Sequence, residues 1–190
     1  MMAKLKDYSK LSVQGFLDDL AAPTASPGGG SGAALVAAIS CALVEMVAGI
    51  NGRRNKAKNP DLAKLAKIRA RLLVLMTEDV KIFKFLLKSL KKKLSTAQRD
   101  SVYLRASSAP IEICRLCVEI AGICEREKKK TSLWLMSDWR EAKILARTAF
   151  YSAWLNIEVN LNEVKNQRST RKTRENLANL QAKIDAYAQS

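Results

Sequence analysis

The sequence predicts an all-α protein, a single-domain bundle of long helices around a central helix made of small residues. Apolar residues recur at spacings of three and four, no segment alternates like a β-strand, and a glycine turn at 27–30 leads into an alanine-rich stretch. At 190 residues the chain fits one domain, 1–190, and we expect 1–8 and 188–190 to fray.

The first two helices are predicted on either side of the glycine turn. Apolar spacing from Ser9 to Leu20 indicates a short helix, and AAPTASP ends it. Ser31 is a natural N-cap for the central helix, which extends to about Asn51. Its alanines recur every four residues, so a neighbouring helix can approach closely. The uncharged run ends at Glu45 and is too short to span a membrane, so we expect no membrane association.

A long amphipathic helix and a broken one follow the basic loop 51–60. Pro60 is placed to begin a helix from Asp61 to about Lys93. Ser95 with Gln98 forms a capping box that opens the next helix, which reaches about Cys124. Pro110 lacks a backbone donor, so we expect a kink or break near Ser107.

The last part of the chain contains one helix and a segment whose direction the sequence leaves open. Ser137 is a predicted N-cap, and Asp138 in the first turn matches the positive end of the helix dipole. This helix runs to around Lys165. The amphipathic segment from Thr170 to Tyr187 either continues it or folds back on it.

Charge and composition exclude several kinds of chemistry. The chain has 33 Lys and Arg against 18 Asp and Glu, a net charge of +15, which favours acidic partners or anionic small molecules. Nucleic acid is one such partner, although no nucleic-acid motif is present. The chain has no His, so it contains neither a Ser-His-Asp triad nor a Cys-His pair, and a general acid or base must come from another residue type.

Cysteine spacing and the first residues give two further expectations. Each of the four cysteines lies in an apolar helical run, so we expect reduced core thiols and no metal site: Cys41, Cys114, Cys117 and Cys124. The opening residues have no hydrophobic signal region, so the expected compartment is the cytoplasm.

Three groups of residues are candidates for chemistry. Gly28, Gly29 and Gly30 permit unusual backbone angles and close approach, and the helix that follows directs N–H groups at a potential anion. The interior carboxylates are Asp79 and Asp138. The amides of Asn156 and Asn160 share one helix face.

Each group also has a purely structural interpretation. The glycines turn a corner, and Asp79 forms a salt bridge with one of the many basic residues. Asp138 complements a helix dipole, and the two amides satisfy neighbouring backbone groups.

The segment PTASPGGGSGAALVAAISCALVEMV resembles the signature of the cyclodeaminase/cyclohydrolase family of folate enzymes. Further landmarks follow in order: EDVKIF with Asp79 and Phe83, then APIEIC, then SDWREA with Ser137 and Asp138, and WLNIEVNL with the two asparagines. The resemblance covers Leu11 to Val164. It implies an all-helical fold, a homodimer, and a tetrahydrofolate derivative as substrate with no tightly bound cofactor.

The resemblance also implies a reaction and residue roles. A cyclohydrolase opens 5,10-methenyltetrahydrofolate with water to give 10-formyltetrahydrofolate, and a cyclodeaminase cyclises 5-formiminotetrahydrofolate and releases ammonia. We expect Asp79 or Asp138 to handle the proton, with Ser137, Asn156 and Asn160 binding the substrate. The turn from Gly28 to Ser31 is expected to bind an anionic group such as the tail of a polyglutamylated folate. Cyclohydrolase comes first because no formiminotransferase segment is attached.

Some positions differ from the family pattern. The loop after the central helix reads GRRNKAK without the usual Tyr, and Leu90 is not followed by the usual Pro. Two alternatives therefore stay open: a non-catalytic basic helical module that binds acidic partners, nucleic acid included, and a folate-binding protein without turnover.

Overall fold

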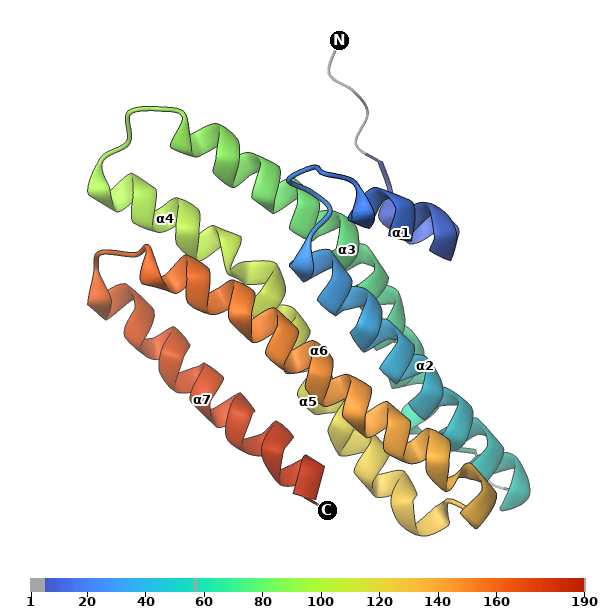
Figure 1. Ribbon diagram of the computed structural model, residues 1–190. Coiled ribbons are helices and arrows are strands. Elements are labelled where there is room, and N and C mark those ends of the chain that lie inside the picture. Colours follow the sequence, from blue (N-terminus) through green and yellow to red (C-terminus); the bar gives the residue numbers. More distant parts are fainter. Residues whose placement is uncertain (1–5, 57, 190) are drawn as a thin grey trace.

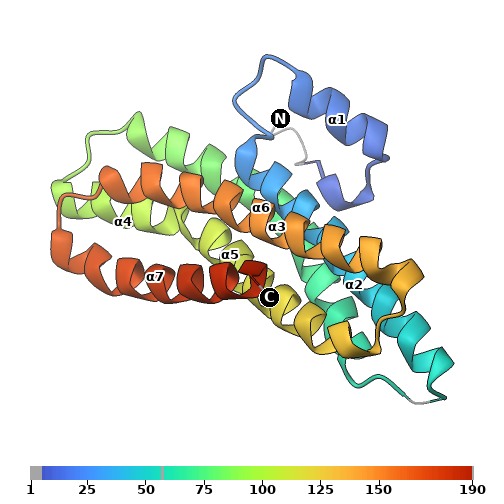
Figure 2. The ribbon, with the colours of Figure 1, turned by 60° about the horizontal axis from the view of Figure 1, so that its bottom comes forward.

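The computed structural model describes residues 6–56 and 58–189, with side chains as far as Tyr187 (Figures 1 and 2). The described residues form helices and no strand, which confirms the predicted fold class. The single-domain organisation stays a prediction, and residues 1–5 and 190 lie outside the described part. The elements are η1 (Tyr8–Lys10), α1 (Val13–Ala21), α2 (Gly29–Arg54), α3 (Asp61–Leu90), α4 (Thr96–Ala106), α5 (Ser108–Glu127), η2 (Lys128–Lys130), η3 (Leu133–Leu135), α6 (Met136–Asn162) and α7 (Gln167–Gln189).

Helix α2 is the centre of the bundle, as the alanine pattern predicts. It packs against α6, α3 and α5, and Figure 1 shows it antiparallel to α6. Fully buried alanines from both helices meet at this contact, so the two backbones lie close together. The Ser40 hydroxyl donates to the Ala142 carbonyl oxygen at 2.8 Å. These alanines are Ala33, Ala34, Ala37, Ala142, Ala146, Ala149 and Ala153.

By length and composition α2 is also capable of crossing a membrane. A core helix of a bundle passes the same test because it is buried on several sides. Here the packing of α2 against three neighbouring helices accounts for its apolar composition.

Two predicted N-caps are wrong. Helix α2 begins at Gly29 with Gly28 as N-cap, and Ser31 lies inside the helix with its side chain fully buried. Its hydroxyl is bonded to groups on α3 instead. Helix α6 begins at Met136, directly after the η3 turn, so Ser137 lies within its first turn and is exposed. Asp138 is in that first turn, as predicted.

The local signals in the middle of the chain are confirmed. Ser95 and Gln98 form the predicted capping box at the start of α4. The predicted break separates α4 from α5 at Ser107, and Pro110 lies three residues later in the first turn of α5. Helix α1 begins later than expected, with Ser12 as its N-cap at 3.0 Å from the Gly15 amide nitrogen.

Helix α7 folds back along the bundle and packs on α5 and α6. The buried Asp100 carboxylate on α4 accepts hydrogen bonds from the Lys165 and Asn166 backbone N–H groups at 2.8 and 2.9 Å. These bonds hold the turn that reverses the chain after α6. The open question about the last segment is thereby settled in favour of the folded-back arrangement.

The interior is as apolar as the sequence predicts. All four cysteines are buried and free, and burial raises the pKa of the Cys41 thiol to about 12.

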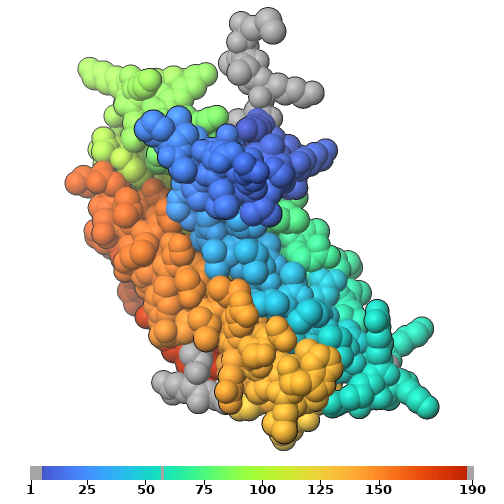
Figure 3. Space-filling model, turned by 45° about the vertical axis from the view of Figure 1, so that its right-hand side comes forward, coloured from blue at the N-terminus to red at the C-terminus, as the bar shows by residue number. Residues whose placement is uncertain are grey.

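Near the N-terminus Tyr8, which we expected in a frayed segment, is buried edge-on against Phe16. Its backbone N–H donates to the Thr77 hydroxyl at 2.9 Å. Figure 3 shows the face on which α1, the outer side of α2 and α6 lie side by side.

Candidate active site

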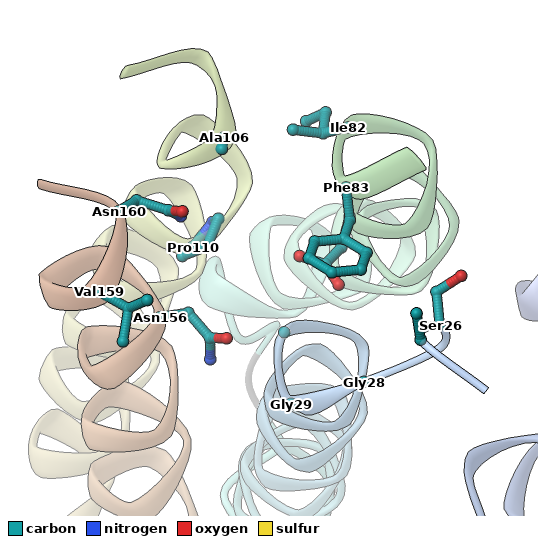
Figure 4. A pocket seen from close by; sticks show the side chains of 13 residues that line it. Ser26, Gly28, Gly29, Ile82, Phe83, Ala106, Pro110, Asn156, Val159 and Asn160 are labelled. Atoms are coloured by element: carbon teal, nitrogen blue, oxygen red, sulfur yellow. The ribbon is translucent and has the colours of Figure 1, made fainter. Parts of the chain in front are cut away.

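A cavity of about 260 Å³ lies where the first turn of α2 meets α3, α6 and the α4–α5 break (Figure 4). Six of the nine residues selected from the sequence line it: the three glycines, Asp79, Asn156 and Asn160. The remaining lining residues are Ala25, Ser26, Ile82, Phe83, Ala106, Pro110 and Val159. A larger hollow of about 510 Å³ is lined only by α6 residues and contains none of the selected ones. The 260 Å³ cavity is therefore the candidate site.

Asp79 is placed against the N-terminus of α2 because residue 30 has no side chain. A Cβ at Gly30 would overlap the Asp79 carboxylate. Of the three glycines, Gly30 serves close approach here, whereas a Cβ at Gly28 would meet no neighbouring atom. The unusual backbone angles that we also considered are not used, since no described glycine has a positive φ. The first turn of α2 therefore directs its N–H groups at a carboxylate from the protein itself.

Burial raises the pKa of Asp79 above its ordinary value, because the charged form is poorly solvated. Hydrogen bonds from Ser31 oppose this rise. Among the described residues no Lys or Arg contributes to this balance, so the salt bridge that we considered for Asp79 is not formed. The carboxylate is thus half-buried and without a cationic partner, which is typical of groups that handle protons.

Ser31 can accommodate both protonation states of Asp79. Its hydroxyl lies 2.9 Å from the Met76 carbonyl oxygen and 3.1 Å from the Asp79 carboxylate. The single hydroxyl hydrogen can point to the ionised carboxylate. When Asp79 is protonated, the carboxyl can donate to Ser31 while Ser31 donates to Met76. Ser31 is therefore a positioning residue behind the cavity.

The two asparagines face Asp79 from α6. Figure 4 shows the amide groups of Asn156 and Asn160 directed from α6 into the cavity. The Asn156 nitrogen donates to the Ser152 carbonyl oxygen at 2.9 Å, so part of its hydrogen-bonding capacity satisfies the backbone. Apolar side chains of Phe83, Pro110 and Val159 complete the walls. This arrangement suits a flat polar ring that carries a positive charge near the carboxylate.

A sequence model described as formiminotransferase-cyclodeaminase matches residues 12–179. The chain belongs to this family. It is 28% identical over 163 residues to the methenyltetrahydrofolate cyclohydrolase of Methylorubrum extorquens, a match that covers 78% of each protein. It is 26% identical to the formimidoyltransferase-cyclodeaminase of Mus musculus over 89% of this chain, and it spans about a third (34%) of that relative. The crystal structure of the formiminotetrahydrofolate cyclodeaminase of Thermotoga maritima superposes with a TM-score of 0.86 at 26% identity, over 95% of this chain and 93% of that one.

The other two selected residues of this family member lie elsewhere. Ser137 and Asp138 are in the first turn of α6, whereas Asn156 is near its other end. At 1.5 Å per residue the separation along the helix from Asp138 to Asn156 is about 27 Å. The structure of the chain therefore brings Asp79 to the cavity and leaves Asp138 remote from it.

Several lining residues were not selected from the sequence, although their spacing offered a signal. Ile82 and Phe83 follow Asp79 by three and four positions, and Val159 follows Asn156 by three, so each shares a helix face with a selected residue. Ser26 and Ala106 gave no such signal, because the loop path and the end of α4 bring them to the cavity.

Proposed function

We propose that this protein is a folate one-carbon enzyme that hydrolyses 5,10-methenyltetrahydrofolate to 10-formyltetrahydrofolate, with cyclisation of 5-formiminotetrahydrofolate as the alternative reaction at the same site. The observation that carries the proposal is Asp79, a half-buried carboxylate with a raised pKa and no cationic partner, facing two amides across an apolar cavity. The names of the relatives support both reactions. Cyclohydrolase comes first because that relative matches over most of both proteins.

In the hydrolysis, water adds to the methenyl carbon between N5 and N10. The Asp79 carboxylate balances the positive charge of the methenyl group and accepts a proton from the attacking water. The tetrahedral adduct then breaks its bond to N5, which receives the proton from Asp79, and the formyl group stays on N10. The other proton of the water leaves to solvent.

In the cyclodeaminase reaction the same carboxyl acts as an acid. N10 adds to the formimino carbon on N5, and the proton of N10 passes to the imino nitrogen. The Asp79 carboxyl donates a second proton to this nitrogen, and the carbon–nitrogen bond breaks to release ammonia and leave the cationic methenyl bridge. Both reactions pass through a tetrahedral carbon between two ring nitrogens. One cavity with one titrating carboxyl therefore serves either.

The remaining roles follow from the positions of the residues. Asn156 and Asn160 orient the pterin ring through their amide groups, with Gly28 and Gly29 lining the opposite side. The N–H groups of the α2 turn serve the Asp79 carboxylate first, and they attract an anionic substrate group only as far as that charge allows. The proposal includes no tightly bound cofactor and a cytoplasmic location.

Two partners belong to the same proposal. The net charge of +15 favours a polyglutamylated folate, whose tail carries several carboxylates. The second partner is another copy of the chain, in a homodimer, because the outer face of α2 is apolar and exposed at Ile39 and Met46.

The test is the loss of methenyltetrahydrofolate absorbance with purified protein. We expect the wild type to exceed the buffer rate and Asp79→Asn to lose about 10²- to 10⁴-fold in kcat, the usual contribution of a general acid or base. Asp138→Asn is the matched variant, since it removes a carboxylate remote from the cavity of its own subunit. Loss with Asp138→Asn and not with Asp79→Asn would reverse the assignment. Absence of turnover of both folates would end the enzyme proposal.

A non-catalytic basic module is the second candidate, and one observation favours it. Basic residues follow each other at the end of α3 and the start of α7, where they include Lys91, Lys92, Arg171 and Lys172. Such clusters bind polyanions in a salt-dependent way. A titration with single- and double-stranded DNA and RNA at low salt tests this candidate, and the absence of binding would exclude it.

A further inference from the structure

The two asparagines of the cavity differ, because a hydrogen bond within α6 fixes the direction of one of them. The Asn156 side-chain nitrogen donates to the Ser152 carbonyl oxygen at 2.9 Å, one turn earlier in the helix. A carbonyl oxygen only accepts hydrogen bonds, so the amide must turn its nitrogen and not its oxygen to Ser152. No bond to another described residue fixes the Asn160 amide in this way. The Asn156 oxygen is thus directed from α6 toward the cavity (Figure 4).

The first turn of α2 leaves room beside this oxygen, because residues 29 and 30 are glycines. A Cβ at Gly29 would lie 3.4 Å from the Asn156 side-chain nitrogen and 3.7 Å from its oxygen. A Cβ at Gly30 would overlap the Asp79 carboxylate. The Cα atoms of consecutive residues are about 3.8 Å apart. The Asn156 amide and the Asp79 carboxylate therefore flank one small region over the same turn.

Both groups present hydrogen-bond acceptors to this region. An ionised carboxylate only accepts, and the Asn156 nitrogen is already bonded to Ser152. The Ser31 hydroxyl reaches Asp79 from behind the cavity, at 3.1 Å from the carboxylate. A small molecule between two acceptors is held best when one of its atoms carries at least two hydrogens. Water and ammonia both meet this condition.

We propose that Asp79 and Asn156 form a subsite for the small molecule that enters or leaves in the reaction, which is water in the hydrolysis and ammonia in the cyclodeaminase reaction. The Asn156 oxygen has two lone pairs, so it can contact the pterin ring and this small molecule together. The inference rests on the proposed function. It adds to that function the position of the attacking or departing atom.

In the hydrolysis the subsite directs a lone pair of the water oxygen at the methenyl carbon. One hydrogen points to the Asp79 carboxylate, which accepts this proton as the carbon–oxygen bond forms. The other hydrogen points to the Asn156 oxygen and stays on the hydroxyl group of the adduct. When the bond to N5 breaks and N5 takes the proton from Asp79, the carbonyl bond forms and the hydroxyl proton passes to solvent. Asn156 orients the water and exchanges no proton with it.

In the cyclodeaminase reaction the departing amino group occupies the same place. The Asp79 carboxyl donates a proton to its nitrogen, and the Asn156 oxygen accepts a hydrogen bond from one of its hydrogens. The carbon–nitrogen bond then breaks while both contacts hold the ammonia. The same two oxygens thus serve the entering water and the departing ammonia.

Replacing each asparagine with leucine tests the subsite. Leucine is close to asparagine in shape and has no polar side-chain atom, so it removes the acceptor and leaves no space for a substitute water. We expect Asn156→Leu to lower kcat for hydrolysis about 10- to 100-fold with a much smaller change in KM, because the attacking water is no longer aligned. Asn160→Leu is the matched variant on the same helix face, and we expect it mainly to raise KM. Equal losses of kcat in the two variants, or wild-type kcat in Asn156→Leu, would overturn the proposal.

Ammonium chloride tests whether the subsite selects a molecule by its hydrogens. The ammonium ion carries hydrogens for both oxygens, whereas the potassium ion has a similar size and the same charge but no hydrogens. At equal ionic strength we expect ammonium chloride to slow the formation of 10-formyltetrahydrofolate by wild type more than potassium chloride does, because ammonium or ammonia displaces the water. In Asn156→Leu this difference should largely disappear. Equal effects of the two salts on wild type, or an undiminished difference in Asn156→Leu, would contradict the subsite.

A crystal structure at high resolution separates this inference from the proposed reaction, because it needs no turnover. We expect an ordered water within hydrogen-bond distance of both the Asp79 carboxylate and the Asn156 side-chain oxygen, and we expect Asn156→Leu to lose it. Absence of this water in wild type, or a water that contacts only one of the two oxygens, would refute the subsite. A bridging water in a protein that turns over neither folate would refute the reaction alone.

Discussion

Gly30 leaves the space that the Asp79 carboxylate occupies at the start of α2. Replacing it with Ala places a methyl group on the carboxylate, so Asp79 must move away from Ser31 and the cavity. We expect Gly30→Ala to lower kcat about as far as removal of the carboxyl does, ~10²-fold or more. Gly49→Ala is the control, since a Cβ there makes only ordinary contact with Leu62. It should keep wild-type activity, and equal losses in both variants would show a general effect on α2.

The hydrogen bonds of Ser31 lower the pKa of Asp79 against the effect of burial, and this predicts a pH effect. Burial raises that pKa and the Ser31 hydrogen bonds lower it, so Ser31→Ala should raise it further. If ionised Asp79 accepts the proton from water, kcat/KM rises with pH through this pKa, and the acidic limb of the profile should move to higher pH in Ser31→Ala. A limb that stays in place would exclude Ser31 from this role.

Asp79 also affects the stability of the fold, and because its pKa is raised in the folded state, stability decreases as the pH rises. The folded state binds the Asp79 proton more tightly than the unfolded state, so stability falls as pH rises from the ordinary pKa of 3.8 to the raised value. Above that window the charged, desolvated carboxylate destabilises the fold. Asp79→Asn should therefore raise the melting temperature at neutral pH relative to wild type and change it little at acidic pH. A lower melting temperature at neutral pH would show that the charge stabilises the fold.

At the level of elements, local sequence signals predicted those boundaries that local contacts determine. The Ser95 capping box and the break before Pro110 depend on residues within a few positions, and both are confirmed. Ser31 was misassigned as a cap because its hydroxyl bonds to α3, 45 and 48 positions away. The reversal before α7 depends on Asp100, 65 positions from Lys165, so the sequence left it open.

The difference between local signals and contacts that are distant in the sequence also applies to the candidate site. Residues at helical spacings, such as Asn156 and Asn160, were recognisable because one helix carries both. That Asp79 and not Asp138 joins them depends on how α2, α3 and α6 cross, which periodicity does not reveal. The close packing of α2 on α6 is thus what assembles the site.

This packing gives a prediction at the level of helices. Ala37 on α2 and Ala146 on α6 are both fully buried, so a larger side chain must separate the two helices. We expect Ala146→Leu to lower the free energy of unfolding by about 1–3 kcal/mol and to reduce activity by widening the cavity. Ala70→Leu, on the exposed side of α3, should change neither. Urea denaturation measures the first effect, and an unchanged midpoint would contradict the close α2–α6 contact.

At the scale of the whole molecule, the net charge of +15 should make the protein bind a substrate with a polyglutamate tail more tightly than the same substrate without the tail. A tail of several carboxylates is attracted by the summed field of the protein, and salt screens this attraction over a Debye length of about 8 Å at physiological ionic strength. We expect a lower KM for a pentaglutamate than for a monoglutamate substrate at low salt, with equal kcat because the tail is distant from the reacting carbon. Raising the salt concentration should bring the two KM values together. If the difference persists at high salt, specific contacts bind the tail, and if it is absent at low salt, the basic surface serves another acidic partner.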